Sequence, residues 1–391
     1  MSVEVVEFPR DVYQDALADY LLLSCLRRLC HADKASLLPR QISLLSRNDL
    51  LQLAQRVLDP QDWALLSHYA DSADRMVAAQ VHSTLPLSVH GHDVQSSAEL
   101  LARRFLDGGN APLWSATRQV LLALEYEKPR HASMQHTHDG SSSFYMGAYK
   151  HGPHKGLCRA TMTHPNTARL LNCFITHLHG QHQWTTTAVL FNYKAPAHID
   201  RHNGPQPNLV TSLSLQDDGD LWIEGPGAEL VEHKGSFVTG QRYSLQLQAV
   251  RFDAHKLLHM TCPWHFLDRA VLVAYTVGQW EKLPPWVVTR LLDLGFHLPD
   301  RTQQIPVLSD CSLPCVIRSD GADGAALSGG WMQQDLGIFT AVPIVQCRRD
   351  DSTRKAVEPG KCNFLLLDRL ELDSPGQAIR LLLPEFEVSR S

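Results

Sequence analysis

Apolar residues in the first third of the chain recur three to four positions apart, which is the spacing of an α-helix that buries one face. The pattern is clear from Val12 to Leu29 and from Leu50 to Val57, and it predicts a helical N-terminal region over residues 1–125. Asp59-Pro60 and Leu85-Pro86 are expected to end helices, because the residue before a proline is pushed out of the helical conformation.

The pattern changes after residue 125. Residues 126–158 are rich in histidine, glycine and serine and are expected to form a loop. Short alternating or β-branched stretches follow, each expected to be a strand: Trp184–Tyr193, Asn208–Leu215, Leu221–Glu224, Arg242–Phe252 and Ala270–Val277. Turn-forming pairs such as Asp218-Gly219 and Lys234-Gly235 separate them. Such a series is typical of an antiparallel sandwich, barrel or jelly roll.

The end of the chain is less regular. Val287 to Leu294 has the pattern of one helix covering the sheet, and beyond residue 300 loop-like stretches alternate with apolar runs such as Phe364 to Leu367. We therefore expect an α+β protein in three parts: the helical region 1–125, a β-rich domain 126–299 and a small β-rich C-terminal appendage 300–391.

The composition of the chain argues against several classes of protein. The 391 residues are 44% hydrophobic and 20% charged, with a net charge of −5, which argues against a protein that coats a polyanion with its whole surface. No apolar run approaches the ~18 residues of a membrane span. The first residues carry acids where a signal peptide needs a basic and then an apolar stretch, so the chain is expected to stay inside the cell. The oligomeric state is left open.

Nine cysteines, an odd number scattered along the chain, fit reduced thiols better than a disulfide framework. Cys311 and Cys315 have a spacing that zinc sites use, but no second pair follows at a matching distance, so no zinc site is predicted there.

His198-Ile199-Asp200 is the first candidate for chemistry. It lies just after a predicted strand, and in extended chain His198 and Asp200 would point to the same side and could face one ion. A second copy, His31-Ala32-Asp33, falls in or just after the first helix, where residues two apart diverge by about 200°. The alternative for His198 is a loop histidine bonded to a nearby aspartate, because short motifs recur by chance in a chain with 21 histidines.

A downstream segment supplies partners for this pair. A two-histidine, one-carboxylate iron site needs one more histidine, and His259 is the candidate, with His255 as the weaker alternative. Arg269 shares strand parity with Val271, so it would point into the interior, where a cation needs an anion. Its planar fork suits the carboxylate of an oxo-acid, although pairing with Asp268 is the alternative.

Two motifs carry a resemblance to the iron(II)/2-oxoglutarate dioxygenase superfamily, specifically its TET/JBP-like branch, which oxidises methyl groups on DNA bases. The stretch His198-Ile199-Asp200-Arg201-His202-Asn203 resembles that branch's His-x-Asp-x-x-Asn signature. His259-Met260-Thr261-Cys262-Pro263, followed by an arginine that opens an apolar strand, resembles its second-histidine segment. The likeness covers roughly residues 140 to 280.

The resemblance implies a double-stranded β-helix (jelly-roll) core. It implies that His198, Asp200 and His259 bind Fe(II), that Arg269 holds the distal carboxylate of 2-oxoglutarate, and that Asn203 contacts the target base. Fe(II) and 2-oxoglutarate would be the cofactors, O₂ a co-substrate and DNA a partner. The implied reaction hydroxylates a nucleobase methyl, of thymine or 5-methylcytosine, after the base is flipped out of the duplex. A nuclear location would follow from a DNA substrate.

The chain departs from this pattern at two points. Related sequences often carry two glycines where this one has Asp218-Gly219-Asp220, and Phe266-Leu267 stands where a tight turn is expected. Asn203 precedes a glycine, so a turn accounts for it as well as a base contact does. The alternatives in function are a protein or small-molecule hydroxylase, and a degenerate, non-catalytic β-helix that serves as a binding module.

Two further groups of polar residues allow both a structural and a functional interpretation. The first is basic and is expected to be a solvated loop, or to contact phosphates if the substrate is DNA: Lys150, His151, His154, Lys155 and Arg159. The second is expected to be polar surface rather than a zinc site: His136, His138, His177, His179 and His182. Trp222 and Tyr275 are expected to be core or rim aromatics.

Overall fold

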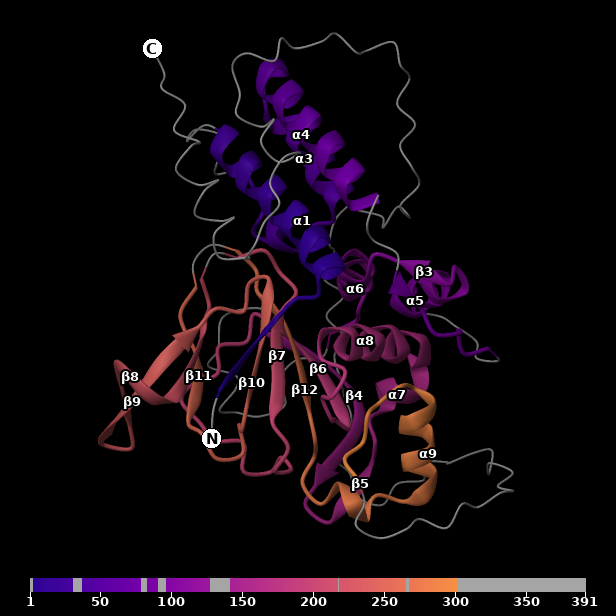
Figure 1. The fold of residues 1–391 in the computed structure, drawn as a ribbon, viewed down its shortest axis with the longest axis vertical. Helices are drawn as coiled ribbons and strands as arrows, with labels where there is room; N and C mark the ends of the chain where they lie inside the picture. Colours follow the sequence, from indigo (N-terminus) through magenta and orange to yellow (C-terminus); the bar gives the residue numbers. More distant parts are fainter. Residues whose placement is uncertain are drawn as a thin grey trace.

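The structure, a computed structural model, describes residues 3–30, 37–78, 83–90, 96–126, 141–216, 218–264 and 267–300. Over these ranges the protein combines helices with antiparallel sheets, as the α+β prediction requires (Figure 1). The predicted C-terminal appendage, the His31-Ala32-Asp33 triplet and the Cys311–Cys315 pair lie outside the described residues.

The N-terminal part is mainly helical, as predicted. Its elements are α1 (Arg10–Leu29), η1 (Arg40–Leu44), α3 (Arg47–Val57), α4 (Pro60–Ala78), α5 (Ser97–Asp107) and α6 (Leu113–Leu122), with β2 (Ser83–Thr84) paired to β3 (Asn110–Ala111). Helix α3 ends before Pro60, but Pro60 begins α4, because the first turn of a helix does not need its missing N–H. Leu85-Pro86 follows β2, so the prediction that it ends a helix is wrong.

The other strands of the described chain form two sheets. The larger has the order β1-β10-β7-β12-β6-β4-β5, and the smaller has the order β11-β8-β9. The larger contains β1 (Glu4–Glu7), β4 (Ser142–His151), β5 (His154–Leu157), β6 (Thr186–Phe191), β7 (Asn208–Ser212), β10 (Gln248–Phe252) and β12 (Ala270–Tyr275); the smaller contains β8 (Leu221–His233), β9 (Ser236–Tyr243) and β11 (His259–Thr261). From β6 onward the chain therefore passes repeatedly between the two sheets: β6 and β7 lie in the larger, β8 and β9 in the smaller, β10 in the larger, β11 in the smaller and β12 in the larger.

Helices cover the outer face of the larger sheet near β4 and β6 (Figure 1). They are α7 (Arg159–Thr163), α8 (Pro165–Leu178) and α9 (Pro285–Asp293), with η3 (Trp280–Lys282) before α9. Helix α9 confirms the predicted covering helix. Helix α8 was not predicted, although its buried residues Leu171, Phe174 and Ile175 have helical spacing. One hydrophobic core runs from Val6 to Phe296 and joins the helices to the sheet.

The predicted loop over residues 126–158 is wrong for its described part, because β4 and β5 lie there. Phe144 and Met146 are buried on β4, and this apolar alternation outweighs the polar composition around it. Gly147 is required at its position: φ is +97°, and a Cβ atom would lie 2.2 Å from the carbonyl oxygen of Thr185.

The predicted strand Arg242–Phe252 is two strands. Strand β9 ends at Tyr243 and β10 begins at Gln248, and Leu247 between them has a φ of 56°, which turns the chain from one sheet to the other. The predicted strand at Leu221 continues to His233 and forms a hairpin with β9. Periodicity located these strands but did not reveal the change of sheet.

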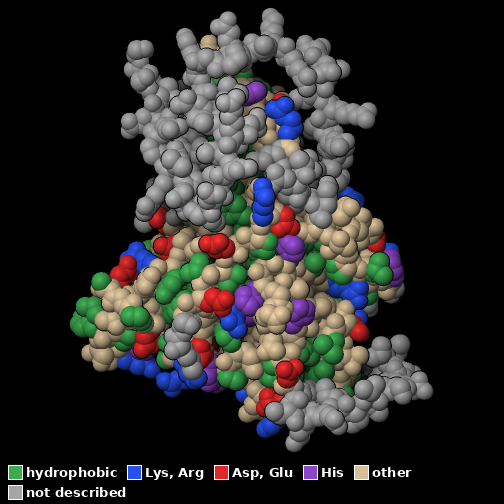
Figure 2. Space-filling view, viewed as in Figure 1, with side chains coloured by type: hydrophobic (Ala, Val, Ile, Leu, Met, Phe, Trp, Pro, Cys, Tyr) green, Lys and Arg blue, Asp and Glu red, His purple; other side chains and the backbone are tan. Residues whose placement is uncertain are grey.

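The N-terminal region also contributes to the larger sheet, because β1 pairs antiparallel with β10. The boundary at residue 125 stays a prediction. On the face shown in Figure 2, acidic and basic side chains are interspersed, which agrees with the modest net charge of −5. No helix in the described ranges is both long and apolar enough to cross a membrane.

A buried arginine ties the helices to the sheet. The side chain of Arg118 on α6 is 2% exposed, and its Nη1 lies 2.8 Å from Asp19 Oδ2 on α1. Its Nη2 donates to the carbonyl oxygen of Ser43 on η1 at 3.0 Å, and its Nε donates to that of Leu213, just after β7, at 3.1 Å. The guanidinium therefore satisfies groups from three separate parts of the fold.

Replacing Arg118 by methionine should lower the free energy of unfolding by about 3–5 kcal/mol, because it leaves a buried carboxylate and several carbonyls without this donor. Urea denaturation of the purified protein measures the change. Arg103→Met is the control, since Arg103 forms an exposed pair with Asp107 at 3.5 Å and its loss should cost no more than about 1 kcal/mol. Equal losses in the two variants would contradict this role for Arg118.

Candidate metal centre and binding pocket

A reciprocal pair of backbone hydrogen bonds brings the two sequence motifs together. The N–H of His198 donates to the carbonyl oxygen of His259, and the N–H of His259 donates to that of His198, both at 3.0 Å. His259 begins β11, which pairs with β8. The segment around His198 is thereby fixed against the outer edge of the smaller sheet.

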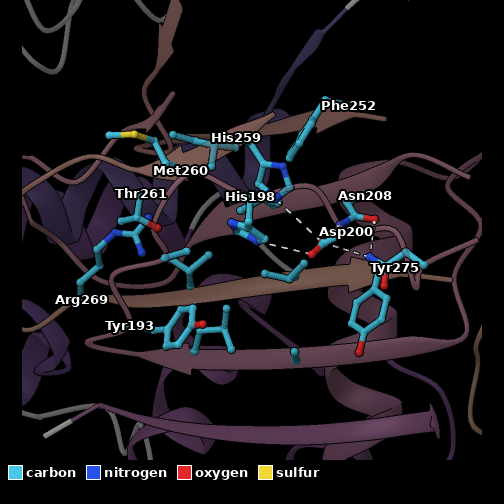
Figure 3. Close-up of a pocket in the computed structure, with 18 of the residues that line it drawn as sticks. Tyr193, His198, Asp200, Asn208, Phe252, His259, Met260, Thr261, Arg269 and Tyr275 are labelled. Carbon is cyan, nitrogen blue, oxygen red and sulfur yellow. Dashed lines mark hydrogen bonds and ion pairs between the residues drawn. The ribbon is translucent and has the colours of Figure 1, made fainter. Parts of the chain in front are cut away.

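His198, Asp200 and His259 point toward one another in the pocket (Figure 3). His198 Nε2 lies 3.4 Å from Asp200 Oδ1, and His259 Nε2 lies 3.9 Å from Asp200 Oδ2. One ligand atom from each residue lies within 4.8 Å of the other two, and this is the one such group of histidine, cysteine or carboxylate side chains in the described residues. His255, the alternative third ligand, does not belong to it.

The histidines are oriented for ligation. Nδ1 of His198 lies 2.7 Å from the carbonyl oxygen of Pro196, and Nδ1 of His259 lies 3.0 Å from that of Leu257. A carbonyl can only accept, so each Nδ1 carries a proton, and Nε2 is the ring nitrogen left to bind a metal. Two imidazoles and one carboxylate so arranged fit a divalent transition metal such as Fe(II).

The local charges suit the same purpose. Burial, followed by the charge of neighbouring His198, lowers the pKa of His259 to about 4, so this imidazole is neutral at physiological pH. Burial opposes the charged form of His198, but the hydrogen bond and charge of Asp200 outweigh it and raise the His198 pKa. Burial would raise the pKa of Asp200, yet His198 and His259 together hold it below its usual value, so the carboxylate is ionised.

Arg269 immediately precedes β12 and is 3% exposed. Its Nε donates to the carbonyl oxygen of Gly219 at 3.0 Å, and its guanidinium lies 5.5 Å from the ring centroid of Trp264. Burial lowers its pKa to about 10, which leaves the group charged at neutral pH. Among the described residues Arg269 has no ion-pair partner; Asp268 instead accepts from Asn192 Nδ2 at 2.8 Å.

Gly219 makes room for this arginine. Its φ is +90°, and a Cβ atom there would lie 2.8 Å from Arg269 Nε and 3.2 Å from Trp264 Cβ. The Asp218-Gly219-Asp220 segment, a departure from the resemblance, therefore keeps a glycine at the point of closest approach.

His198, Asp200, His259 and Arg269 line one pocket of about 190 Å³ between the two sheets. In Figure 3, Arg269 and Thr261 lie at one side, Tyr275 and Asn208 lie at the other, and the His198–Asp200–His259 group lies between them. The remaining walls are mostly apolar or aromatic: Tyr145, Ala188, Leu190, Tyr193, Ala195, Val210, Leu221, Phe252, Met260, Val271 and Val273. The pocket thus combines a ligand set, a buried cation and an apolar wall.

Asn203 and Asn208 support Asp200. Asn203 Nδ2 donates to Asp200 Oδ2 at 3.1 Å, and Asn208 Nδ2 donates to the same oxygen at 3.2 Å. The contact of Asn203 with a target base stays a prediction. Asn208 was not predicted as a site residue, and its one signal in the sequence is that it is polar and opens a predicted strand.

The described histidines of the second group each contact a different partner. His177 Nε2 lies 2.7 Å from Asp11, His179 Nε2 lies 3.6 Å from Glu4, and His182 Nε2 lies 3.2 Å from the carbonyl oxygen of Ala274. His182 is 1% exposed, so the expectation of a surface residue is wrong for it. His136 and His138 lie outside the described residues. Trp222 is in the core, whereas Tyr275 lines the pocket.

No protein-family model and no curated protein matches this chain. Solved structures similar to it include a prolyl-4-hydroxylase from Pseudomonas putida, with 12% identity, a TM-score of 0.25 and coverage of 52% of this chain and 96% of the other. A 2OG-Fe(II) oxygenase-family oxidoreductase from Burkholderia pseudomallei has 11% identity, a TM-score of 0.28 and coverage of 50% and 95%. A Trichoplax adhaerens prolyl hydroxylase has 11% identity, a TM-score of 0.26 and coverage of 56% and 94%.

These neighbours are two prolyl hydroxylases and one oxidoreductase of the 2OG-Fe(II) oxygenase family, all at low identity, and the TET/JBP-like assignment stays a prediction. Similarities this weak do not support a function, so the proposed function rests on the geometry of the site alone.

Replacing His198, Asp200 or His259 by alanine should weaken binding of a divalent metal by more than about 100-fold, because even residues that only support a ligand are worth about 10–100-fold. Anaerobic calorimetric titration with Fe(II) measures the affinity of each folded variant. His255→Ala is the matched control and should bind as the native chain does. A His255→Ala variant that loses metal while His259→Ala keeps it would reverse the assignment.

Proposed function

We propose that this protein is an Fe(II)/2-oxoglutarate-dependent dioxygenase. The observation that carries the proposal is the convergence, in one pocket, of the His198–Asp200–His259 group and the buried cation of Arg269. A structural ion pair would explain a histidine next to an aspartate. It would not explain two histidines that both present Nε2 to one carboxylate, beside an arginine without a carboxylate partner in the described chain.

The order of the strands supports a double-stranded β-helix. Strands β6, β7, β10 and β12 are neighbours in the larger sheet, while β8, β9 and β11, with the segment at His198 bridged to β11, form the smaller one. Both chain motifs then meet at the open side between two facing antiparallel sheets, which is where jelly-roll proteins enclose ligands.

His198, Asp200 and His259 would hold iron(II), which when bound supplies the redox chemistry by which O₂ and 2-oxoglutarate oxidise a C–H bond. Asp200 provides the negative charge of the group, and the two imidazoles provide neutral donors. The apolar wall formed by Leu190, Val271 and other residues excludes water from the pocket, which strengthens the electrostatic contacts inside it.

Arg269 would bind the distal carboxylate of 2-oxoglutarate. A buried cation is unfavourable unless an anion or a ring compensates it, and here Trp264 and the Gly219 carbonyl do so only in part. Thr261 lines the same side of the pocket in Figure 3 and offers a hydroxyl beside the guanidinium. The planar fork of arginine matches both oxygens of one carboxylate.

As the substrate we propose a nucleobase methyl in DNA, thymine or 5-methylcytosine. The chain contains no aspartate or glutamate between Asp139 and Asp200, a stretch that includes Lys150 and Lys155 on the β4–β5 hairpin. These two lysines are cross-strand partners, an arrangement that is unfavourable without an anion nearby, and neither has a carboxylate partner in the described chain. Tyr145, on the same hairpin, is 38% exposed and lines the pocket, where it could stack on a base.

Purified protein supplied with Fe(II), 2-oxoglutarate and O₂ should release succinate, because the pocket holds both a metal-ligand group and a carboxylate-binding cation. Asp200→Ala should reduce the release to background, since it removes the charged ligand. Succinate is measured by mass spectrometry after fixed times. A folded native protein that binds no iron and releases no succinate would contradict the enzyme and favour a non-catalytic binding module.

Arg269→Lys should raise the KM for 2-oxoglutarate by at least about tenfold, because an ammonium keeps the charge but loses the two-point contact. Its affinity for Fe(II) should be unchanged, since Arg269 is not part of the ligand group. Steady-state succinate release against 2-oxoglutarate concentration gives KM. Arg242→Lys is the matched control, because Arg242 pairs with Glu229 on the surface at 2.8 Å and its KM should stay native.

The substrate is tested by adding methylated duplex DNA, unmethylated duplex DNA or a proline-containing peptide to the same reaction. Stimulation by methylated DNA alone, with a mass gain of one oxygen on the base, is the expected result. Stimulation by the peptide or by neither polymer would favour the alternative of a protein or small-molecule hydroxylase.

A further inference from the structure

The carboxylate of Asp200 is held asymmetrically. Its Oδ2 accepts from the side-chain amides of both Asn203, at 3.1 Å, and Asn208, at 3.2 Å. Its Oδ1 lies 3.4 Å from His198 Nε2, and its Oδ2 lies 3.9 Å from His259 Nε2. Oδ2 is therefore occupied by two neutral amide donors, whereas Oδ1 faces His198 and accepts from no amide in the described chain.

The two amides also fix each other. Asn203 Nδ2 donates to Asn208 Oδ1 at 3.4 Å as well as to Asp200, so its two hydrogens have two acceptors. Exchanging the oxygen and nitrogen of Asn208 would set a carbonyl against the carboxylate and place two donors face to face. The chemistry of the donors thus determines the orientation of both amides.

The backbone around these amides is well anchored. Asn208 is 2% exposed and opens β7 opposite Phe252 of β10. Asn203 is half-buried, its N–H donates to the carbonyl oxygen of Asp200 at 3.0 Å, and it forms an isolated bridge with Val277. The two donors, five residues apart, therefore reach Asp200 from a turn and from the buried start of β7.

We propose that Asn203 and Asn208 are positioning residues for the metal site: together they hold Oδ2 of Asp200, so that Oδ1 is presented to the metal ion. The inference rests on the proposed function, because it takes Asp200 as an iron ligand. It differs from the base contact that the resemblance implies for Asn203, because both amide hydrogens of Asn203 are already used within the protein.

Loss of either amide should loosen the ligand. The terminal torsion of an aspartate is broad, so without the two N–H groups the carboxylate would rotate among several orientations. Only some of those orientations present an oxygen to the ion together with His198 and His259. Residues that orient a metal ligand in this way are typically worth about 10–100-fold in metal affinity.

The test uses Co(II) with the full chain, because Co(II) binding and its visible absorption require no turnover. Asn208→Leu keeps the size of the side chain and removes the N–H donor; it should weaken Co(II) binding at least about tenfold and shift the absorption bands. Asn203→Leu should change both in the same direction. Because Asn203 is half-buried on a turn, it decides the question if Asn208→Leu does not fold.

Asn166→Leu is the matched control. Asn166 is buried, and its Nδ2 donates to Glu99 Oε1 at 2.8 Å between α5 and α8, so this variant loses the same kind of amide-to-carboxylate bond far from the pocket. It should lower thermal stability but keep the native Co(II) affinity and spectrum.

The possible outcomes separate the two proposals. A folded native chain that does not bind Co(II) or Fe(II) overturns the proposed function itself. A native chain that binds, with both leucine variants within about twofold of its affinity and with its spectrum, overturns the positioning role alone.

Discussion

The site depends on the two hydrogen bonds exchanged by the backbones of His198 and His259. Each histidine reaches the pocket from a short extended segment that has little structure of its own, and β11 spans only His259–Thr261. Pairing the two backbones fixes the separation of their side chains, so the rings lie with centroids 4.3 Å apart. Asp200, two residues after His198, lies close to both rings, at 3.4 Å from His198 Nε2 and 3.9 Å from His259 Nε2.

The larger sheet supplies the other half of the pocket. Strand β12 lies between β6 and β7 along its length, so its inward residues form a continuous apolar wall that begins at Arg269. Burying a guanidinium at the start of that wall is unfavourable, and the protein compensates with a carbonyl, an indole ring and a glycine that makes room for both. Under the proposed function, the distal carboxylate of 2-oxoglutarate would complete this compensation.

The parts of the fold that depend on local periodicity could be predicted from the sequence, whereas those that depend on distant partners could not. Helices α1 and α3 and strand β12 are evident from their spacing and β-branched composition. Strand β4 is not, because its polar neighbours hide an alternation that matters only once β6 lies beside it. The reversal at Leu247, which moves the chain between sheets, likewise has no local signal.

Some residues of the candidate site could likewise be predicted from the sequence, and others could not. His198 and Asp200 could be recognised because their spacing has a meaning in extended chain, and Arg269 because strand parity turned it inward. Asn208 was missed, since its contact with Asp200 arises from the packing of β7 against the loop that follows His198. The acid-free stretch before Asp200 was visible in the sequence, but it gained significance only when β4 and β5 proved to be a hairpin beside the pocket.

The pairing of β1 with β10 has a consequence for how the protein is made. Residues 4–7 are synthesised before their partner strand, at residues 248–252, which follows roughly 12–50 s later at typical elongation rates. Throughout that interval the larger sheet lacks the strand that β1 caps, and Glu4 lacks Arg251, with which it finally pairs at 2.8 Å. The N-terminal helices can fold earlier during translation, whereas β1 cannot pair until residues 248–252 have been synthesised.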